Sequence, residues 1–263
     1  MLRFFRQLRQ NLFSKNPSDK AGQRNKFNIS SFRAGRYFLY ALGEVVLIVV
    51  GILLAFYVDN INADKQAREV EIDLLNEIKA NLVSNIQILE RTLTTESDYL
   101  HYNEMILDFL DNRKAYDKDL DRAFGVYFWT ISTNPVTGGY EFLKSKGIDL
   151  VTNDSLRSRI SFIFENEFSI LKSENEVWSN NLQQNISYPY HVKHFRRYYS
   201  TDENNSEIEL AKPFDYQSLL EDDEFKSINT EIISNRKWNI NSLQNLILEI
   251  EGLIGQIDRE LKK

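Results

Sequence analysis

The feature that most constrains this chain is an apolar segment over residues 37–58, YFLYALGEVVLIVVGILLAFYV, which carries one charged side chain, Glu44. As an α-helix it would measure about 33 Å, enough to cross the ~30 Å hydrocarbon core of a bilayer. Tyrosines lie near both ends of the segment, where an aromatic belt meets the membrane surface. Because a buried core helix is seldom apolar on every side, the segment predicts a membrane-spanning helix.

A cleavable signal peptide is the closest alternative to a permanent anchor. The apolar region of a signal peptide normally holds about 7–15 residues and is followed by a cleavage site of small residues. The apolar region here is longer, and AFYVDNINADK at its end offers no convincing site of that kind. The sequence therefore favours an uncleaved anchor.

Charge is distributed unevenly on the two sides of the apolar segment. Residues 1–36 hold nine Lys and Arg side chains and one acid, Asp19, although the whole chain has a net charge of −6. Basic flanking segments are retained in the cytoplasm, so we expect the N-terminus to be cytoplasmic. The expected organisation is a cytoplasmic tail over 1–36, a transmembrane helix over 37–58 and an extracytoplasmic domain over 59–263. The expected location is the inner (plasma) membrane, with the domain in the periplasm if the cell is a diderm bacterium.

The first residues of the tail, MLRFFRQLRQNLF, repeat apolar side chains every three or four positions with arginines between them. This pattern predicts a short basic amphipathic helix that lies on the inner leaflet, with its arginines at anionic headgroups. The side chains expected to contact lipid are Arg3, Phe5, Arg6 and Arg9. The alternative is a solvated basic tail that only fixes the topology.

A carboxylate inside a bilayer is costly, so Glu44 requires an explanation. Ile48, Gly51 and Ala55 follow it at helical steps on the same face. Small residues let a second helix approach closely, and a carboxyl group on that face can form a hydrogen bond across the contact. We predict that this stripe binds a second copy or another membrane helix. The alternatives are that Glu44 reaches the headgroups or is protonated, or that it belongs to a proton or ion path.

The tail and the apolar segment together resemble a known pattern. FFRQLRQNLFS is followed by GRYFLYALGEVVLIVVGILLAFYVDNIN, and the matching positions are Arg36, Tyr37, Tyr40, Ala41, Gly43, Glu44, Gly51, Ile52, Leu53 and Ala55. This series resembles the N-terminal signature of a family of uncharacterised bacterial single-span membrane proteins. YEFLKSKGIDLVTNDSLRSRI, over 140–160, resembles the second recurring segment of that family. The resemblance implies a single-span topology and assigns no activity.

Beyond the apolar segment the sequence predicts helices. No Gly or Pro occurs between Gly51 and Gly125, so one helix can continue from the span into the body. Apolar residues recur at steps of three and four over 72–93 and 243–261, which predicts two amphipathic helices packed antiparallel with coiled-coil-like spacing. We find no convincing strand and expect a loop over 189–213. The predicted fold class is all-α, a transmembrane helix that continues into a helical bundle.

Shorter signals divide the middle of the body. The aromatic stretch 119–132 predicts a core helix, and NPVTGG over 134–139 predicts a turn. A helix over 140–145 is expected to end at Gly147. Asn153 can cap the helix that follows, which is expected to extend toward residue 186.

The chain carries few signals of chemistry. Its lack of cysteine excludes disulfides, cysteine-ligated metal and a cysteine nucleophile. His191 and His194 lie three residues apart, but no third ligand is local, so packing is favoured over a metal site. Arginines and aromatic residues surround these histidines and could bind nucleic acid, but the chain beyond the tail is too acidic to favour that partner. No nucleotide-binding, hydrolase or zinc-protease motif occurs. We expect no cofactor, metal, nucleic-acid partner or catalytic residue.

These features favour a membrane-anchored helical interaction or scaffold protein. Its expected partners are the lipid membrane and either further copies of itself or another membrane protein. An extracytoplasmic ligand sensor that signals through a partner protein is the alternative, and an envelope enzyme with dispersed catalytic residues is a third possibility.

Overall fold

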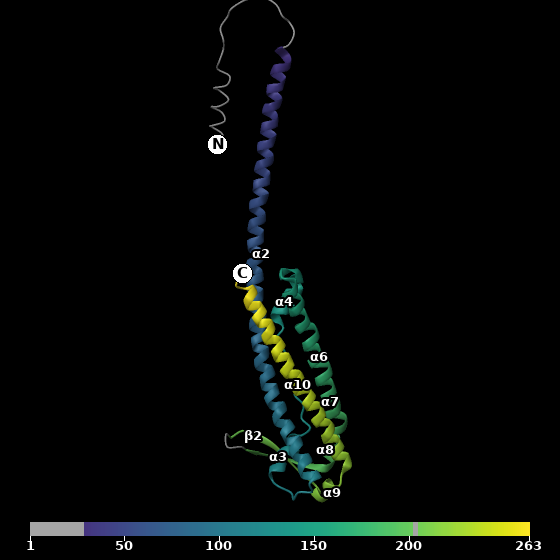
Figure 1. The fold of residues 1–263 in the computed structure, drawn as a ribbon. Helices are drawn as coiled ribbons and strands as arrows, with labels where there is room; N and C mark the ends of the chain where they lie inside the picture. Colours follow the sequence, from purple (N-terminus) through teal and green to yellow (C-terminus); the bar gives the residue numbers. More distant parts are fainter. Residues whose placement is uncertain (1–28, 202–204) are drawn as a thin grey trace, which may run out of the picture. The chain divides into compact units, whose positions relative to one another are not determined.

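The computed structural model describes residues 29–201 and 205–263. Backbone contacts divide the chain into two compact units, Met1–Ala63 and Asp64–Lys263. Among the described residues helices dominate both units, and the only strands are two that form one small sheet (Figure 1). The predicted all-α fold class is confirmed.

The first described helix is α2, Ile29–Asp111. Its sequence contains no proline and no glycine after Gly51, so nothing interrupts the backbone hydrogen bonds of the helix. The helix ends at the polar sequence DNRK, where Arg113 adopts a left-handed conformation with φ of 49°. The backbone N–H of Lys114 then donates to the carbonyl oxygen of Phe109 at 2.9 Å, which closes the last turn.

In the unit over 64–263, α10 (Asp223–Glu260) runs antiparallel to the second half of α2 (Figure 1). At one end, Arg68 donates a hydrogen bond to the carbonyl oxygen of Glu260 at 2.8 Å. Toward the other end, the ammonium of Lys237 lies 2.8 Å from the carboxylate of Glu104. The predicted antiparallel pair is therefore confirmed, whereas its coiled-coil geometry stays a prediction.

The α10 helix begins well before residue 243, where the apolar periodicity indicated its start. The carboxylate of Asp222 accepts a hydrogen bond from the backbone N–H of Phe225 at 2.9 Å and so caps the first turn. The earlier turns of α10 bury Asn229 and Arg236. These polar side chains break the apolar pattern that the prediction used.

A third helical run packs against this pair. The side chain of Asn153 caps its first turn by accepting from the backbone N–H of Leu156 at 3.2 Å, as predicted. The run continues past residue 186 to His194, because Pro189 lies in the first turn of α8, where a missing N–H is tolerated. It alternates between α-helical and π-helical segments: α5 (Asp154–Phe162), η2 (Ile163–Glu167), α6 (Phe168–Ile170), η3 (Leu171–Glu176), α7 (Val177–Leu182), η4 (Gln183–Ser187) and α8 (Tyr188–His194).

Four short helices complete the unit. They are α3 (Asp119–Val126), α4 (Gly138–Lys146), the 3-10 helix η1 (Ile148–Leu150) and α9 (Tyr216–Leu220). The α3 helix is shorter than the helix predicted over 119–132. The predicted end of α4 is confirmed, since Gly147 has φ of 113° and its N–H donates to the carbonyl oxygen of Leu143 at 3.0 Å.

The turn before α4 and the first turn of α4 are held on α2 by two asparagines. The side-chain amide of Asn85 donates to the carbonyl oxygen of Val136 at 3.0 Å and accepts from its N–H at 2.6 Å. Asn81 accepts from the N–H of Gly139 at 2.8 Å. A Cβ at Gly139 would lie 3.1 Å from the backbone of α2, so this close contact depends on glycine.

The prediction of a loop over 189–213 is wrong. That stretch contains most of α8 and an antiparallel hairpin, β1 (Phe195–Thr201) and β2 (Glu207–Pro213), with Phe195 paired to Pro213. The polar residues and the two prolines of this stretch indicated a loop, but Pro213 lies at the end of its strand, where a missing N–H is tolerated.

A contact distant in sequence stabilises this hairpin. The α3 helix lies so close to β2 that a Cβ at Gly125 would be 2.6 Å from the carbonyl oxygen of Glu209. That carbonyl also accepts a hydrogen bond from Arg122 of α3 at 2.9 Å. The strands therefore depend on tertiary packing, which a local sequence pattern does not report.

Two apolar cores lie along the unit over 64–263. The first joins α2 between Leu74 and Leu89 to α4, to the run from α5 to η3, and to the last part of α10. The second joins the end of α2 to α3, the hairpin, α8, α9 and the start of α10. Buried polar side chains lie between the two cores: Glu96 and Asn103 of α2, and Arg236 and Asn239 of α10.

Candidate membrane helix and a buried polar layer

The part of α2 over 38–58 exposes its apolar side chains. The large hydrophobic residues whose side chains are described there are between 47% and 68% exposed, from Val49 to Phe38. The apolar window of α2 has a mean hydropathy of 2.6, and none of it is buried inside the structure. By length and composition, α2 can cross a membrane.

The stripe predicted for helix contact lies in this part of α2. Glu44, Ile48, Gly51 and Ala55 are all exposed, and their spacing of four, three and four residues brings them to one side of the helix. A Cβ added at Gly51 or at Gly43 would meet no heavy atom within 4 Å. Within the described residues of one chain, both glycines therefore have open space around them.

The predicted lipid contacts of the tail, Arg3, Phe5, Arg6 and Arg9, lie outside the described residues.

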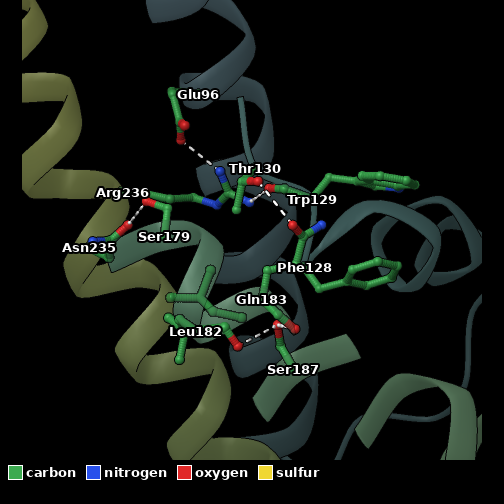
Figure 2. Close-up of a pocket in the computed structure, with 11 residues that line it drawn as sticks. Glu96, Phe128, Trp129, Thr130, Ser179, Leu182, Gln183, Ser187, Asn235 and Arg236 are labelled. Atoms are coloured by element: carbon green, nitrogen blue, oxygen red, sulfur yellow. Dashed lines mark hydrogen bonds and ion pairs between the residues drawn. The ribbon is translucent and has the colours of Figure 1, made fainter. Parts of the chain in front are cut away.

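Between the two apolar cores, the guanidinium of Arg236 lies at the centre of a buried polar layer (Figure 2). Its Nη1 donates to the carboxylate of Glu96 at 2.6 Å, and both side chains are at most 5% exposed. Its Nη2 donates to the carbonyl oxygens of Trp129 at 2.6 Å and Tyr127 at 3.2 Å. One arginine therefore ties α10 to α2 and to the chain that follows α3.

Two asparagines extend this layer. The amide of Asn103 accepts from Nε of Arg236 at 2.9 Å and donates to the side-chain oxygen of Asn229 at 2.6 Å. Asn229 donates in return to the carbonyl oxygen of Asn103 at 2.7 Å. Because the amides of Asn103 and Asn229 both have partners for donor and acceptor, these two side chains avoid the penalty of unsatisfied polar groups.

A small cavity lies beside Arg236 (Figure 2). Its volume is about 20 Å³, room for one water molecule. Its wall includes Thr130, whose hydroxyl lies 2.9 Å from the side-chain oxygen of Asn180, and Ser179, which donates to Asn235 at 2.8 Å. A cavity of this size suits a bridging water, whereas a metabolite needs several hundred Å³.

The polar layer is suited to positioning helices. The carboxylate of Glu96 is neutralised by a guanidinium whose other donors bind carbonyl and amide oxygens. A polar residue in an otherwise apolar helix contact is best known for fixing the register of the two helices. We therefore interpret the layer as a structural site.

Sequence reasoning missed this layer. Glu96 and Asn103 are seven residues apart, and so are Asn229 and Arg236. A seven-residue step returns to the same side of a helix. The sequence therefore did contain a signal for the buried layer. It was these two polar pairs at seven-residue spacing, in line with the apolar residues before and after them.

His191 and His194 lie in different surroundings. The ring of His191 is buried, 1% exposed, and packs against Phe128 at 4.5 Å between centroids. His194 stacks on Tyr190 at 4.2 Å. Burial, with a smaller contribution from the positive charge of Arg197, lowers the pKa of His191 to about 4. Among the described residues no three His, Cys, Asp or Glu side chains are placed to hold a metal ion.

Comparison with known proteins assigns no relative. No family model, no curated protein and no solved structure matches this chain. The resemblance of its N-terminal part to single-span membrane proteins therefore stays a prediction.

Residues 140–160, the second segment that carries this resemblance, contact other helices of the unit. The ring of Tyr140 is buried and stacks on Phe164 at 4.8 Å. The buried carboxylate of Glu71 in α2 accepts hydrogen bonds from both the N–H and the hydroxyl of Thr152, at 2.7 and 2.9 Å. Asn153 donates to Glu260 at 2.6 Å. These contacts join α5 to α2 and α10.

Proposed function

We propose that this protein is a membrane-anchored helical interaction protein that assembles with further copies of itself. The observation that carries the proposal is the exposure of the apolar part of α2 over 38–58. The unit over 64–263 has its own apolar cores, so its stability does not require this segment. A hydrocarbon environment suits such a segment, because exposing its side chains to water is unfavourable.

The proposed topology places the basic tail in the cytoplasm and the acidic unit outside the inner membrane. The nine basic side chains of residues 1–36 support this orientation. Contacts of Arg3, Phe5, Arg6 and Arg9 with the inner leaflet belong to the same proposal.

Carbonate extraction of cell membranes and reporter fusions at the C-terminus test the anchor and its orientation. The intact chain is expected to stay in the membrane pellet, and a reporter active only outside the cytoplasm is expected to function. A chain released by carbonate, or a C-terminus found in the cytoplasm, would contradict the proposal.

Assembly through the stripe of Glu44, Ile48, Gly51 and Ala55 has a matched test. Gly51→Ile adds a bulky side chain on the stripe, and Gly43→Ile makes the same change about 80° around the helix from Gly51. Both sites have open space within the described residues of one chain, so a difference in association between the two variants is attributed to contacts between chains. Gly51→Ile is expected to weaken association in membranes, measured by energy transfer between labelled chains, and Gly43→Ile to leave it unchanged. Equal association in both variants would refute the role of the stripe.

A further inference from the structure

An open groove lies between the third helical run and α10. Val177 and Trp178 of α7 form one wall, and Trp238 of α10 forms part of the other. These side chains are 54%, 58% and 44% exposed, and the volume between the walls is about 480 Å³. Two half-exposed tryptophans beside one groove are unusual on a surface that meets only water, since tryptophan is concentrated at protein interfaces.

The apolar face continues along the helical run on both sides of the groove. Phe162, Ile170, Trp178 and Ile186 are 40–58% exposed and follow one another at steps of eight residues. In a pure α-helix a step of eight would turn away by about 80°. Here each step includes four or more residues of a π-helical segment, η2, η3 or η4. Because a π-helix holds more residues per turn, eight residues make about two full turns, and the four side chains stay in line.

A buried row with the same step supports this geometry. Ile163, Leu171, Ser179 and Ser187 are all buried and are likewise eight residues apart. The π-helical segments therefore keep one row in the core and a neighbouring row on the surface. A surface row of this kind is an apolar face along one side of the helical run.

The polar residues of the groove suit contact with an identical surface. Ser173 and Asn181 lie on one wall and Ser234 and Asn235 on the other, and each has both a donor and an acceptor. Among the side chains that the structure describes, Glu231 is the one charged residue that lines the groove, in a chain whose charged residues make up 27%. A two-fold contact brings each residue near its own copy, so it requires self-complementary chemistry and few charges.

The area of this face is sufficient for a dimer. The four side chains of the row together with Val177 and Trp238 are each about half exposed. At about 200 Å² for a large side chain, they offer roughly 600 Å² per chain, or roughly 1,200 Å² for two, the lower limit for a specific interface.

We propose that the face centred on Trp178 and Trp238 is the contact between two copies of this chain. This inference rests on the proposed self-assembly and names a surface for it outside the membrane helix.

Cysteine cross-linking of the full-length chain in membranes tests the contact. Because the natural chain has no cysteine, each single-cysteine variant carries one thiol. Asn181→Cys and Ser234→Cys place that thiol in the groove, and Ser200→Cys on β1 is an exposed control outside it. The two groove variants are expected to form disulfide-linked dimers on mild oxidation, and the control to remain monomeric. Groove thiols that react with maleimide yet cross-link no more than Ser200→Cys would overturn the proposal.

A second variant in the Ser234→Cys background identifies the side chains responsible. Trp178→Gln is expected to reduce the cross-linked fraction about tenfold or more, since interface tryptophans are commonly dominant contributors. Leu248→Gln changes another apolar residue of α10, 64% exposed and not part of the groove, and is expected to have no effect. Equal cross-linking in the two variants would overturn the proposal. Failure of the membrane anchor appears separately, as release by carbonate, and does not prevent groove thiols from cross-linking.

Discussion

Replacement of Arg236 by methionine tests the buried polar layer most directly. The substitution removes the hydrogen bonds to Glu96, Asn103, Tyr127 and Trp129 and leaves the carboxylate of Glu96 in a site that is 5% exposed. Removal of one partner of a buried ion pair typically costs about 3–5 kcal/mol. We expect a loss of about this size in the free energy of unfolding.

The buried ion pair also predicts the order of stability of related variants. Glu96→Leu combined with Arg236→Met removes the stranded charge, so the double variant is expected to be more stable than Arg236→Met alone. Lys237→Met removes the neighbouring ion pair with Glu104, whose side chains are 56% and 48% exposed. An exposed pair contributes about 0–1 kcal/mol, so Lys237→Met serves as the control.

Urea unfolding of the detergent-solubilised chain provides the measurement. The three tryptophans, Trp129, Trp178 and Trp238, all lie in the unit over 64–263, so their fluorescence follows the unfolding of that unit. A loss below about 1 kcal/mol for Arg236→Met would refute the reasoning, as would a double variant less stable than the single one.

Three further predictions concern the same unit. Gly125→Ala is expected to lower the free energy of unfolding by about 1–3 kcal/mol, because the added Cβ would overlap the backbone of β2. Gly255→Ala is the control: it lies in an open helical site, so it is expected to raise the free energy of unfolding by about 1 kcal/mol. The pKa of His191 is about 4 in the folded protein and 6.5 ordinarily, so between these pH values the unfolded chain binds a proton that the folded protein does not. The free energy of unfolding should therefore fall as the pH drops from about 6.5 to 4. His191→Phe should weaken this pH dependence in the same urea assay. Glu71→Gln is expected to loosen the start of α5, measured as faster amide hydrogen exchange there, because a neutral amide accepts the two bonds from Thr152 less strongly than a carboxylate.

The parts of the fold that the sequence predicts are those set by neighbouring residues. The cap at Asn153 and the left-handed glycine at Gly147 depend on a few adjacent positions, and both were found where the sequence placed them. The apolar face of α2 and that of α10 likewise follow from the local period of each sequence, and these two faces predicted that the helices pack antiparallel. Each of these features is determined within a few turns of the chain.

The hairpin and the polar layer depend on residues far apart in the sequence. The strands form beside α3, and the absence of a side chain at Gly125 matters only once β2 lies against it. Asn103 and Asn229 are 126 residues apart, and Glu96 and Arg236 are 140 apart. A polar residue within an apolar pattern appears exposed until the partner that buries it is known, so the pattern alone placed the start of the predicted α10 too late in the chain.

The polar layer also explains why α2 and α10 pack in one register. An apolar stripe with a seven-residue repeat allows two helices to slide by seven residues with little loss of contact. In one direction that slide would place Leu243 opposite Glu96, and in the other it would place Leu89 opposite Arg236. Either shift would bury a charge without its partner, which costs several kcal/mol.

The buried polar layer also reaches the groove. Asn235, which lines the groove, accepts a hydrogen bond from Ser179 of α7 at 2.8 Å, so the layer extends from α10 to the third helical run. Trp238 follows Asn235 by less than one turn, which places it across the groove from Trp178. Loss of the layer would therefore disturb the proposed contact between copies even though Arg236 itself is buried. On this reasoning Arg236→Met should also reduce the cross-linking of Ser234→Cys, whereas Lys237→Met should leave it unchanged. Equal cross-linking in the two variants would show that the contact between copies does not depend on the buried polar layer.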